Sequence, residues 1–171
     1  MDESQTRKIL SAAGHDQYGA RLLKASIKRL RPILDRLPIL GQSIVDVCQR
    51  GWIDTCVVAL AVGCHKLDLI DQAQDYQTRC RNLLNIEIVT WRIQEIPAFI
   101  PCEIMLMLGL RKNKSRVRTC DGFISDSLFR GGHLILNCGI RDDLRSTIAH
   151  DFKLRWSRSN ERRGLFLYER L

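Results

Sequence analysis

Arginine and lysine are the side chains whose type and number point most directly to chemistry in this sequence. The chain has 27 Lys and Arg residues against 19 Asp and Glu, which gives a formal net charge of +8 at pH 7. Twenty of the 27 are Arg, whose planar guanidinium binds phosphate through two hydrogen bonds and stacks on flat rings. This composition favours recognition of an anionic partner.

Three segments carry much of this charge: residues 21–36, 111–118 and 153–163. If they meet on one side of the fold, they form an electropositive surface that neutralises phosphates and releases their counterions. The third segment also contains a tryptophan whose ring can stack on a base. The predicted nucleic-acid-binding residues are therefore Arg21, Lys24, Lys28, Arg31, Arg111, Lys112, Lys114, Arg116, Arg118, Lys153, Arg155, Trp156, Arg158, Arg162 and Arg163.

The same segments allow a second interpretation, in which each is a separately solvated basic surface without a ligand. Anionic lipid and acidic protein are further candidate partners. The sequence contains no RRM, KH, zinc-knuckle or helix-turn-helix signature. The evidence for nucleic-acid binding is therefore only electrostatic and indicates no particular nucleic-acid-binding domain. Residues 111–118 also have the composition of a nuclear import signal.

The remaining reactive side chains follow no catalytic pattern. The four histidines, His15, His65, His133 and His150, lie in no GxSxG, HExxH or Cys/His signature. The glycine pair 131–132 precedes a predicted strand, whereas a phosphate-binding glycine loop precedes a helix. We therefore expect no catalytic residue and no cofactor, and hence a protein that is not an enzyme.

Seven cysteines occur at positions 48, 56, 64, 80, 102, 120 and 138. No CxxC pair is present, whereas zinc sites usually combine closely spaced pairs of ligands. We predict no metal site and expect reduced, mostly buried thiols. Free thiols are typical of a reducing compartment, so the predicted location is intracellular, cytoplasmic and/or nuclear.

The elements that must position the basic residues are predicted to be helical up to residue 110. Leucine and isoleucine at helical spacing indicate an amphipathic helix over 17–37. Glycines divide the apolar region that follows into two short helices, 43–50 and 52–62, which we expect to pack as a central hairpin. A further helix is predicted over 72–95, and 102–110 is expected to be a short helix or strand.

The pattern becomes extended after the basic segment 111–118. Residues 133–140, 152–156 and 164–168 are predicted strands, and the charged stretch between the last two reads as a hairpin loop. The predicted fold class is α+β, with four to five short helices followed by a small antiparallel sheet. The predicted organisation is a helical part at 1–110, a basic linker and loop at 111–130, and a small β part at 131–171.

Residues 96–110 form a near-apolar stretch with two prolines and one glutamate. Fifteen residues are too few for a membrane span, which needs about 20, and we predict no transmembrane segment. The stretch has two other interpretations: a buried segment that closes the helical core, or an element that binds a partner or a membrane surface.

These observations together predict a small, basic, Arg-rich protein that binds nucleic acid, RNA rather than DNA, without enzymatic activity. Its size and composition suggest a viral regulatory or accessory protein acting in a host cell. One alternative is a protein–protein interaction module that uses the helical hairpin 39–71 or the stretch 96–110, with a host protein or a second copy of the chain as partner. Another is a matrix-like peripheral protein on an anionic membrane.

Overall fold

The computed structural model describes residues 4, 11, 17–38, 41–47, 51–108, 121–138, 150–159 and 164–171. Helices and strands alternate along most of this part of the chain. The elements are α2 (Gln17–Leu34), β1 (Ser43–Asp46), α3 (Trp52–Ala61), β2 (Lys66–Ile70), α4 (Gln74–Leu83), β3 (Glu87–Trp91), the 3₁₀ helix η1 (Ile93–Glu95), β4 (Cys102–Leu108), α6 (Asp121–Ser127), β5 (Leu128–Cys138), β6 (Phe152–Ser159) and β7 (Gly164–Arg170).

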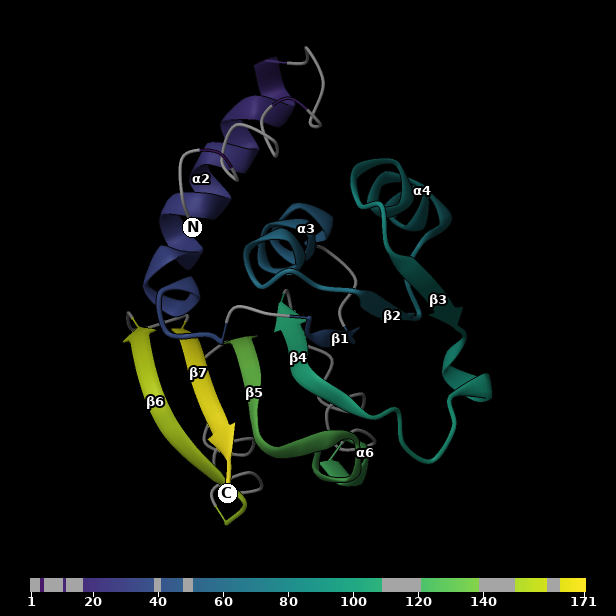
Figure 1. Ribbon diagram of the computed structural model, residues 1–171, viewed down its shortest axis with the longest axis vertical. Helices are drawn as coiled ribbons and strands as arrows, with labels where there is room; N and C mark the ends of the chain where they lie inside the picture. Colours follow the sequence, from purple (N-terminus) through teal and green to yellow (C-terminus); the bar gives the residue numbers. More distant parts are fainter. Residues whose placement is uncertain are drawn as a thin grey trace.

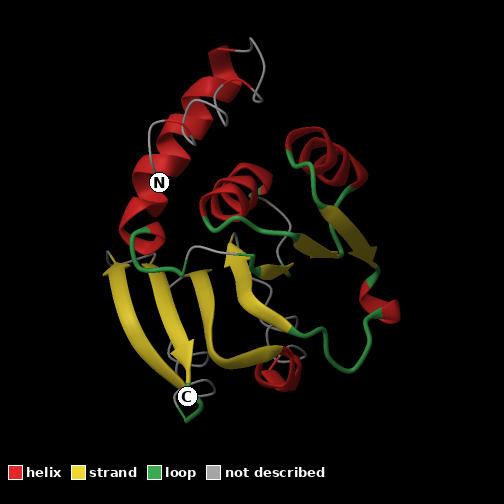
Figure 2. Ribbon diagram, in the orientation of Figure 1, coloured by secondary structure: helices red, strands yellow, loops and turns green. Residues whose placement is uncertain are grey.

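A seven-stranded mixed sheet forms the centre of the molecule (Figures 1 and 2), with strand order β3-β2-β1-β4-β5-β7-β6. The neighbouring strands from β3 to β5 are parallel, whereas β7 runs antiparallel to both β5 and β6. The prediction of a helical N-terminal part followed by a small antiparallel sheet is therefore wrong. The fold is α/β, because strands alternate with helices from β1 to β5.

The central helical hairpin was the main error in the predicted elements. Residues 43–46 form β1, which lies between β2 and β4 and is buried throughout, whereas α3 confirms the second predicted helix. A parallel strand that is buried on both faces is apolar without the alternation typical of exposed strands. Such a short apolar run resembles a buried helix in sequence. The predicted helix 72–95 likewise divides into α4 and β3.

Several predicted elements do form. Helix α2 confirms the amphipathic helix, and β5, β7 and β6 pair antiparallel as expected for the last three strands. These three strands nevertheless belong to the large sheet, because β5 also pairs with β4 in parallel register. The basic segment 111–118 lies outside the described residues, so its role as a linker stays a prediction.

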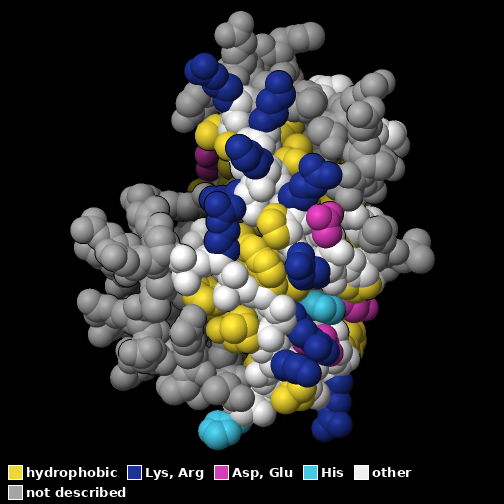
Figure 3. Space-filling view, turned by 90° about the vertical axis from the view of Figure 1, so that its left-hand side faces the viewer, with side chains coloured by type: hydrophobic (Ala, Val, Ile, Leu, Met, Phe, Trp, Pro, Cys, Tyr) yellow, Lys and Arg dark blue, Asp and Glu magenta, His cyan; other side chains and the backbone are white. Residues whose placement is uncertain are grey.

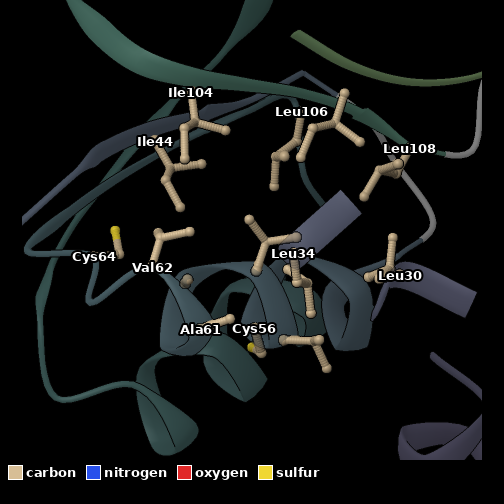
Figure 4. Close-up of a cluster of buried hydrophobic side chains, with 14 of the residues drawn as sticks. Leu30, Leu34, Ile44, Cys56, Ala61, Val62, Cys64, Ile104, Leu106 and Leu108 are labelled. Atoms are coloured by element: carbon tan, nitrogen blue, oxygen red, sulfur yellow. The ribbon is translucent and has the colours of Figure 1, made fainter. Parts of the chain in front are cut away.

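Helices α2, α3 and α4 pack on one face of the sheet. In Figure 4, Leu34 of α2 faces Leu106 of β4, and Leu30 faces Leu108; all four side chains are buried in one apolar cluster. A second cluster on the other face joins side chains of β1, β2, β4 and β7 to Ile124 of α6. The sheet is thus covered on both faces, as parallel sheets require.

Two further expectations concern cysteines and membranes. Cys56, Cys64, Cys80 and Cys102 are free and buried, as predicted. Residues 102–108 of the apolar stretch form the buried strand β4. None of the described helices is long and apolar enough to cross a bilayer.

Candidate active site

The strand order of the sheet marks one position where a ligand can bind. From β1 the chain moves outward through β2 to β3, and then returns to the opposite side of β1 with β4. In open α/β sheets, ligands bind outside the carboxyl ends of the strands at the point where the order reverses. Here that point lies between the carboxyl ends of β1 and β4, at Asp46 and Leu108.

Asp46, the last residue of β1, is buried and holds α3 and α4 together. The Thr55 hydroxyl of α3 donates a hydrogen bond to Asp46 Oδ2 at 2.7 Å, and the Tyr76 hydroxyl of α4 donates to the same oxygen. Burial, followed by the neighbouring Asp46 carboxylate, raises the pKa of Tyr76 well above its ordinary value. Tyr76 therefore remains a hydrogen-bond donor, and the cluster fixes α3 and α4 against the end of β1.

Asp71 lies directly beyond the carboxyl end of β2, in the left-handed backbone conformation (φ 53°). Its backbone N–H donates to the carbonyl oxygen of Trp91 at 2.8 Å, which fixes it to the end of β3. Non-glycine residues seldom adopt this conformation, and such positions concentrate at ligand-binding sites. The position of Asp71 is that of the acidic residue that binds ribose hydroxyls in doubly wound nucleotide-binding folds.

The end of β3 is held in place by a buried carboxylate. Asp68 of β2 is 1% exposed. It accepts a hydrogen bond from Trp91 Nε1 at 2.8 Å, and its other oxygen lies 3.5 Å from Lys66 Nζ. Because this network pins Trp91, it also stabilises the carbonyl group that anchors Asp71. The carboxyl ends of β2 and β3 thus form one rigid edge.

Helix α3 begins at the same edge, because it follows β1. Asp54 in its first turn is buried and accepts hydrogen bonds from two residues of α2, Ser26 Oγ and Arg29 Nη2. The carboxylate suits this position, because the N-terminal end of a helix carries partial positive charge. The contact joins α2 to the edge where a ligand would lie.

The predicted basic residues that the structure describes lie on α2 and β6. Arg21, Lys24, Lys28 and Arg31 are exposed on α2, and Lys153, Arg155 and Arg158 are exposed on β6. Figure 3 shows Lys and Arg side chains gathered on the side of the molecule that α2 and β6 form. Residues Arg111, Lys112, Lys114, Arg116, Arg118, Arg162 and Arg163 lie outside the described part.

The basic residues of β6 differ from those of α2 in their surroundings. Arg155 Nε donates to Glu169 Oε2 of β7 at 2.6 Å, so an acidic partner offsets its charge. Trp156 is half-buried and packs against the apolar cluster beneath α2. The pairing partners of Lys153 and His133 on β7 are the same residue, Glu169. His133 lies in the middle of β5 and pairs with Ile104 near the amino end of β4, so this polar group lies away from the carboxyl edge.

Comparison with known proteins gives matches in structure and none in sequence. No protein-family model matches the chain, and no curated protein matches it by sequence. N-methyltransferase NodS from Bradyrhizobium japonicum has a TM-score of 0.62 at 15% identity, over 86% of this chain and 94% of that one. M. jannaschii TYW2, solved in complex with AdoMet, has a TM-score of 0.56 at 11% identity, over 85% and 77%. The M. jannaschii tRNA m1G37 methyltransferase has a TM-score of 0.60 at 13% identity, over 85% and 49%.

The class defined by this strand order and these similarities is the Rossmann-like methyltransferase fold. The finding corrects the predicted function, because two of the similar structures, NodS and the M. jannaschii tRNA m1G37 methyltransferase, are methyltransferases. A viral accessory protein that binds RNA without catalysis, an interaction module built on the hairpin 39–71 and a matrix-like membrane protein are all contradicted as descriptions of this chain. The same comparison contradicts the prediction that the protein is not an enzyme.

Sequence reasoning missed the residues at the carboxyl edge, Asp46, Asp54 and Asp71. One signal could have found the last of them. Asp71 follows Gly51 by 20 residues, which is the usual separation between a nucleotide-binding loop and its ribose-binding acid. The signal is hard to detect, because the loop lacks the G-x-G-x-x-G pattern and the apolar sequence of β1 also predicts a helix.

Proposed function

We propose that this chain binds S-adenosylmethionine at the carboxyl edge of its sheet and transfers the methyl group to RNA. The observation that carries the proposal is the position of Asp71, at the end of β2 and beside the point where the strand order reverses. A carboxylate there can accept hydrogen bonds from both ribose hydroxyls of an adenosine group.

The residues between β1 and α3 argue against a dinucleotide as the ligand. They read Val47, Cys48, Gln49, Arg50 and Gly51, with a single glycine. A dinucleotide requires further glycines, so that the backbone can approach its pyrophosphate closely. S-adenosylmethionine has no pyrophosphate, so the loop composition is compatible with it.

Different residues of the described part would bind the ligand and support its binding site. Asp71 would accept from the ribose, and the Asp68–Trp91 hydrogen bond would keep the supporting edge rigid. The buried cluster of Asp46, Thr55 and Tyr76 would fix the start of α3 against β1. When bound, S-adenosylmethionine supplies a methyl group attached to a positively charged sulfur, which a nucleophilic nitrogen or oxygen of the acceptor can take.

RNA is the acceptor class that the charge of the chain supports. The net charge of +8 and the predominance of Arg suit a phosphate backbone. One of the similar structures is a tRNA methyltransferase. The proposal keeps the predicted nucleic-acid contacts on α2 and assigns them to binding of the RNA substrate. These residues are Arg21, Lys24, Lys28 and Arg31.

The test is isothermal titration calorimetry with S-adenosylmethionine and with S-adenosylhomocysteine. We expect binding to the wild type and a loss of about tenfold or more for Asp71→Asn, because hydrogen bonds to a charged group contribute about 1.5–3 kcal/mol. Asp75→Asn is the matched control, since Asp75 is an exposed acid in the first turn of α4. Absence of binding to the wild type, or equal losses in the two variants, would refute the proposal.

A second measurement addresses the transfer itself. Wild-type protein is incubated with methyl-labelled S-adenosylmethionine and either RNA or a protein mixture, and the label in each acceptor is counted. Label in RNA that disappears with Asp71→Asn supports the proposal. Label in protein alone would leave the cofactor assignment in place and remove RNA as the acceptor.

A further inference from the structure

The last turns of helix α2 pack against the sheet. Along β4, Leu34 faces Leu106 and Leu30 faces Leu108, the last residue of the strand (Figure 4). Toward its N-terminus, α2 therefore runs in the direction of the carboxyl edge. The 13 residues that precede Leu30 in α2 extend about 20 Å at 1.5 Å per residue.

The N-terminal part of α2 continues past the sheet, as Figure 1 shows. In the middle of the helix, Ser26 and Arg29 both donate hydrogen bonds to Asp54 at the beginning of α3. Because Asp54 lies just after the β1–α3 loop, these contacts place the middle of α2 beside the candidate active site. The hydrogen bonds also restrict its movement relative to that site.

The charged residues of α2 all have one sign. Residues 21–34 contain no Asp or Glu, and the exposed residues Arg21, Lys24, Lys28 and Arg31 recur at helical spacing on one side of the helix. Arg29 is offset by Asp54. Among the residues that the structure describes, the other four have no acidic partner within ion-pair distance, unlike Arg155 on β6.

We infer that the basic face of α2, formed by Arg21, Lys24, Lys28 and Arg31, is the surface on which the RNA substrate docks, so that its target nucleotide reaches the carboxyl edge of the sheet. The inference rests on the proposed function, and adds where and in which form the RNA binds. Contacts to phosphates fix the register and orientation of a nucleic acid without reading its sequence. A row of four exposed cations beside a catalytic edge suits that role.

The form of the RNA follows from the chemistry. An enzyme that modifies a base must reach an atom that is inaccessible inside a stacked duplex, so it acts on unpaired or flipped nucleotides. RNA recognition also favours loops and single strands, whose bases are free to turn outward. We therefore expect an RNA stem–loop to bind α2 more tightly than a fully paired RNA duplex of the same length.

The experiment measures fluorescence anisotropy of a labelled RNA stem–loop at several salt concentrations. The arm variant, Lys24→Gln/Lys28→Gln, removes two charges from α2, and the control variant, Arg81→Gln/Arg130→Gln, removes two exposed charges elsewhere. We expect the arm variant to bind at least about tenfold more weakly. Its salt slope should be shallower by about 1.4, because each phosphate contact on a single strand contributes about 0.7. The control variant should match the wild type, and circular dichroism checks that all are folded.

Other outcomes would overturn the inference. The first is an equal loss of RNA affinity in the arm and control variants, and the second is a loss of RNA affinity found only with Lys153→Gln/Arg158→Gln on β6. The third is equal affinity of the wild type for the stem–loop and the duplex. The fourth is weaker binding of the arm variant to phosphatidylserine vesicles with no change in its binding to RNA. Calorimetry with S-adenosylmethionine on the same samples separates the two proposals. If cofactor binding is present and the arm effect is absent, only the docking inference fails. If the arm effect is present without cofactor binding, RNA docking stands and methyl transfer fails.

Discussion

Arg29 of α2 forms a salt bridge with Asp54 in the first turn of α3. Ser26, one turn earlier on α2, donates to the other oxygen of the same carboxylate. Asp54 is buried, whereas the Arg29 side chain is 46% exposed. Two consecutive turns of the basic helix are thereby joined to the segment that follows the first strand.

The first prediction concerns this connection. Asp54→Asn keeps the size of the side chain but removes its charge, so the ion pair is lost while an oxygen remains for Ser26. We expect a decrease in the free energy of unfolding of about 1–2 kcal/mol in urea titrations, because Arg29 is partly exposed. Asp35→Asn, at an exposed residue near the end of α2, should change stability little. Equal stability of Asp54→Asn and wild type would mean that the contact does not hold α2.

A second prediction concerns the cluster below the candidate site. Tyr76→Phe and Thr55→Val each remove one donor from the buried carboxylate of Asp46. Each should cost about 1–3 kcal/mol of unfolding free energy, because a buried charged acceptor is left with fewer partners. Thr78→Val on the exposed side of α4 is the control.

The double variant tests whether the cluster acts as a unit. Thr55 and Tyr76 lie 2.8 Å apart and share one acceptor, so the combined loss in Thr55→Val/Tyr76→Phe should differ from the sum of the single losses. Simple additivity would show that the two hydroxyls stabilise Asp46 independently.

The sequence predicts the local elements of the second half better than those of the first. Alternating side chains in residues 152–156 identify β6, because an edge strand with one exposed face keeps the period of two. The central strands β1 and β4 show no alternation, since both faces are buried. For them, a short apolar run is compatible with a helix or a strand.

The pairing of strands far apart in sequence is the other part that local patterns cannot supply. Ile44 of β1 pairs with Ile104 of β4 across 60 residues, and no turn between them indicates this partner. Once β1 and β4 are adjacent, the reversal of strand order and the position of Asp71 follow. The four predicted basic residues of α2 are exposed, and their role in binding nucleic acid stays a prediction; their place relative to the carboxyl edge depends on this long-range pairing.

A third prediction concerns the buried thiols. Burial raises the pKa of Cys64 and of Cys102 to about 12, and Cys56 lies with its sulfur 3.8 Å from that of Cys80 in the core. Because the thiolate is the reactive form, these four should resist iodoacetamide at pH 8 in the native protein and react in urea. Peptide mass spectrometry identifies the modified positions. Rapid native labelling of Cys64 or Cys102 would contradict the buried arrangement.

The last prediction is a pH dependence set by His133 on β5. Burial is the main cause that lowers its pKa below 6.5; Arg155 lowers it further, and Glu169 opposes the shift. The unfolded chain, with a histidine pKa of about 6.5, therefore binds more protons than the folded chain as the pH falls through that value. Stability contributed by neutral His133 is present above about pH 6.5 and is lost on acidification toward the folded pKa.

Urea titrations at pH 7.5 and 5.5 measure this effect. The free energy of unfolding of the wild type should fall between the two values, and His133→Gln should show a smaller fall. His150→Gln is the control, because His150 is exposed. Glu169 does not interfere in this range, since its pKa is lowered by Arg155 and it stays ionised. If His133→Gln and wild type lose the same stability on acidification, protonation of His133 does not limit the fold, and other groups must account for the pH dependence.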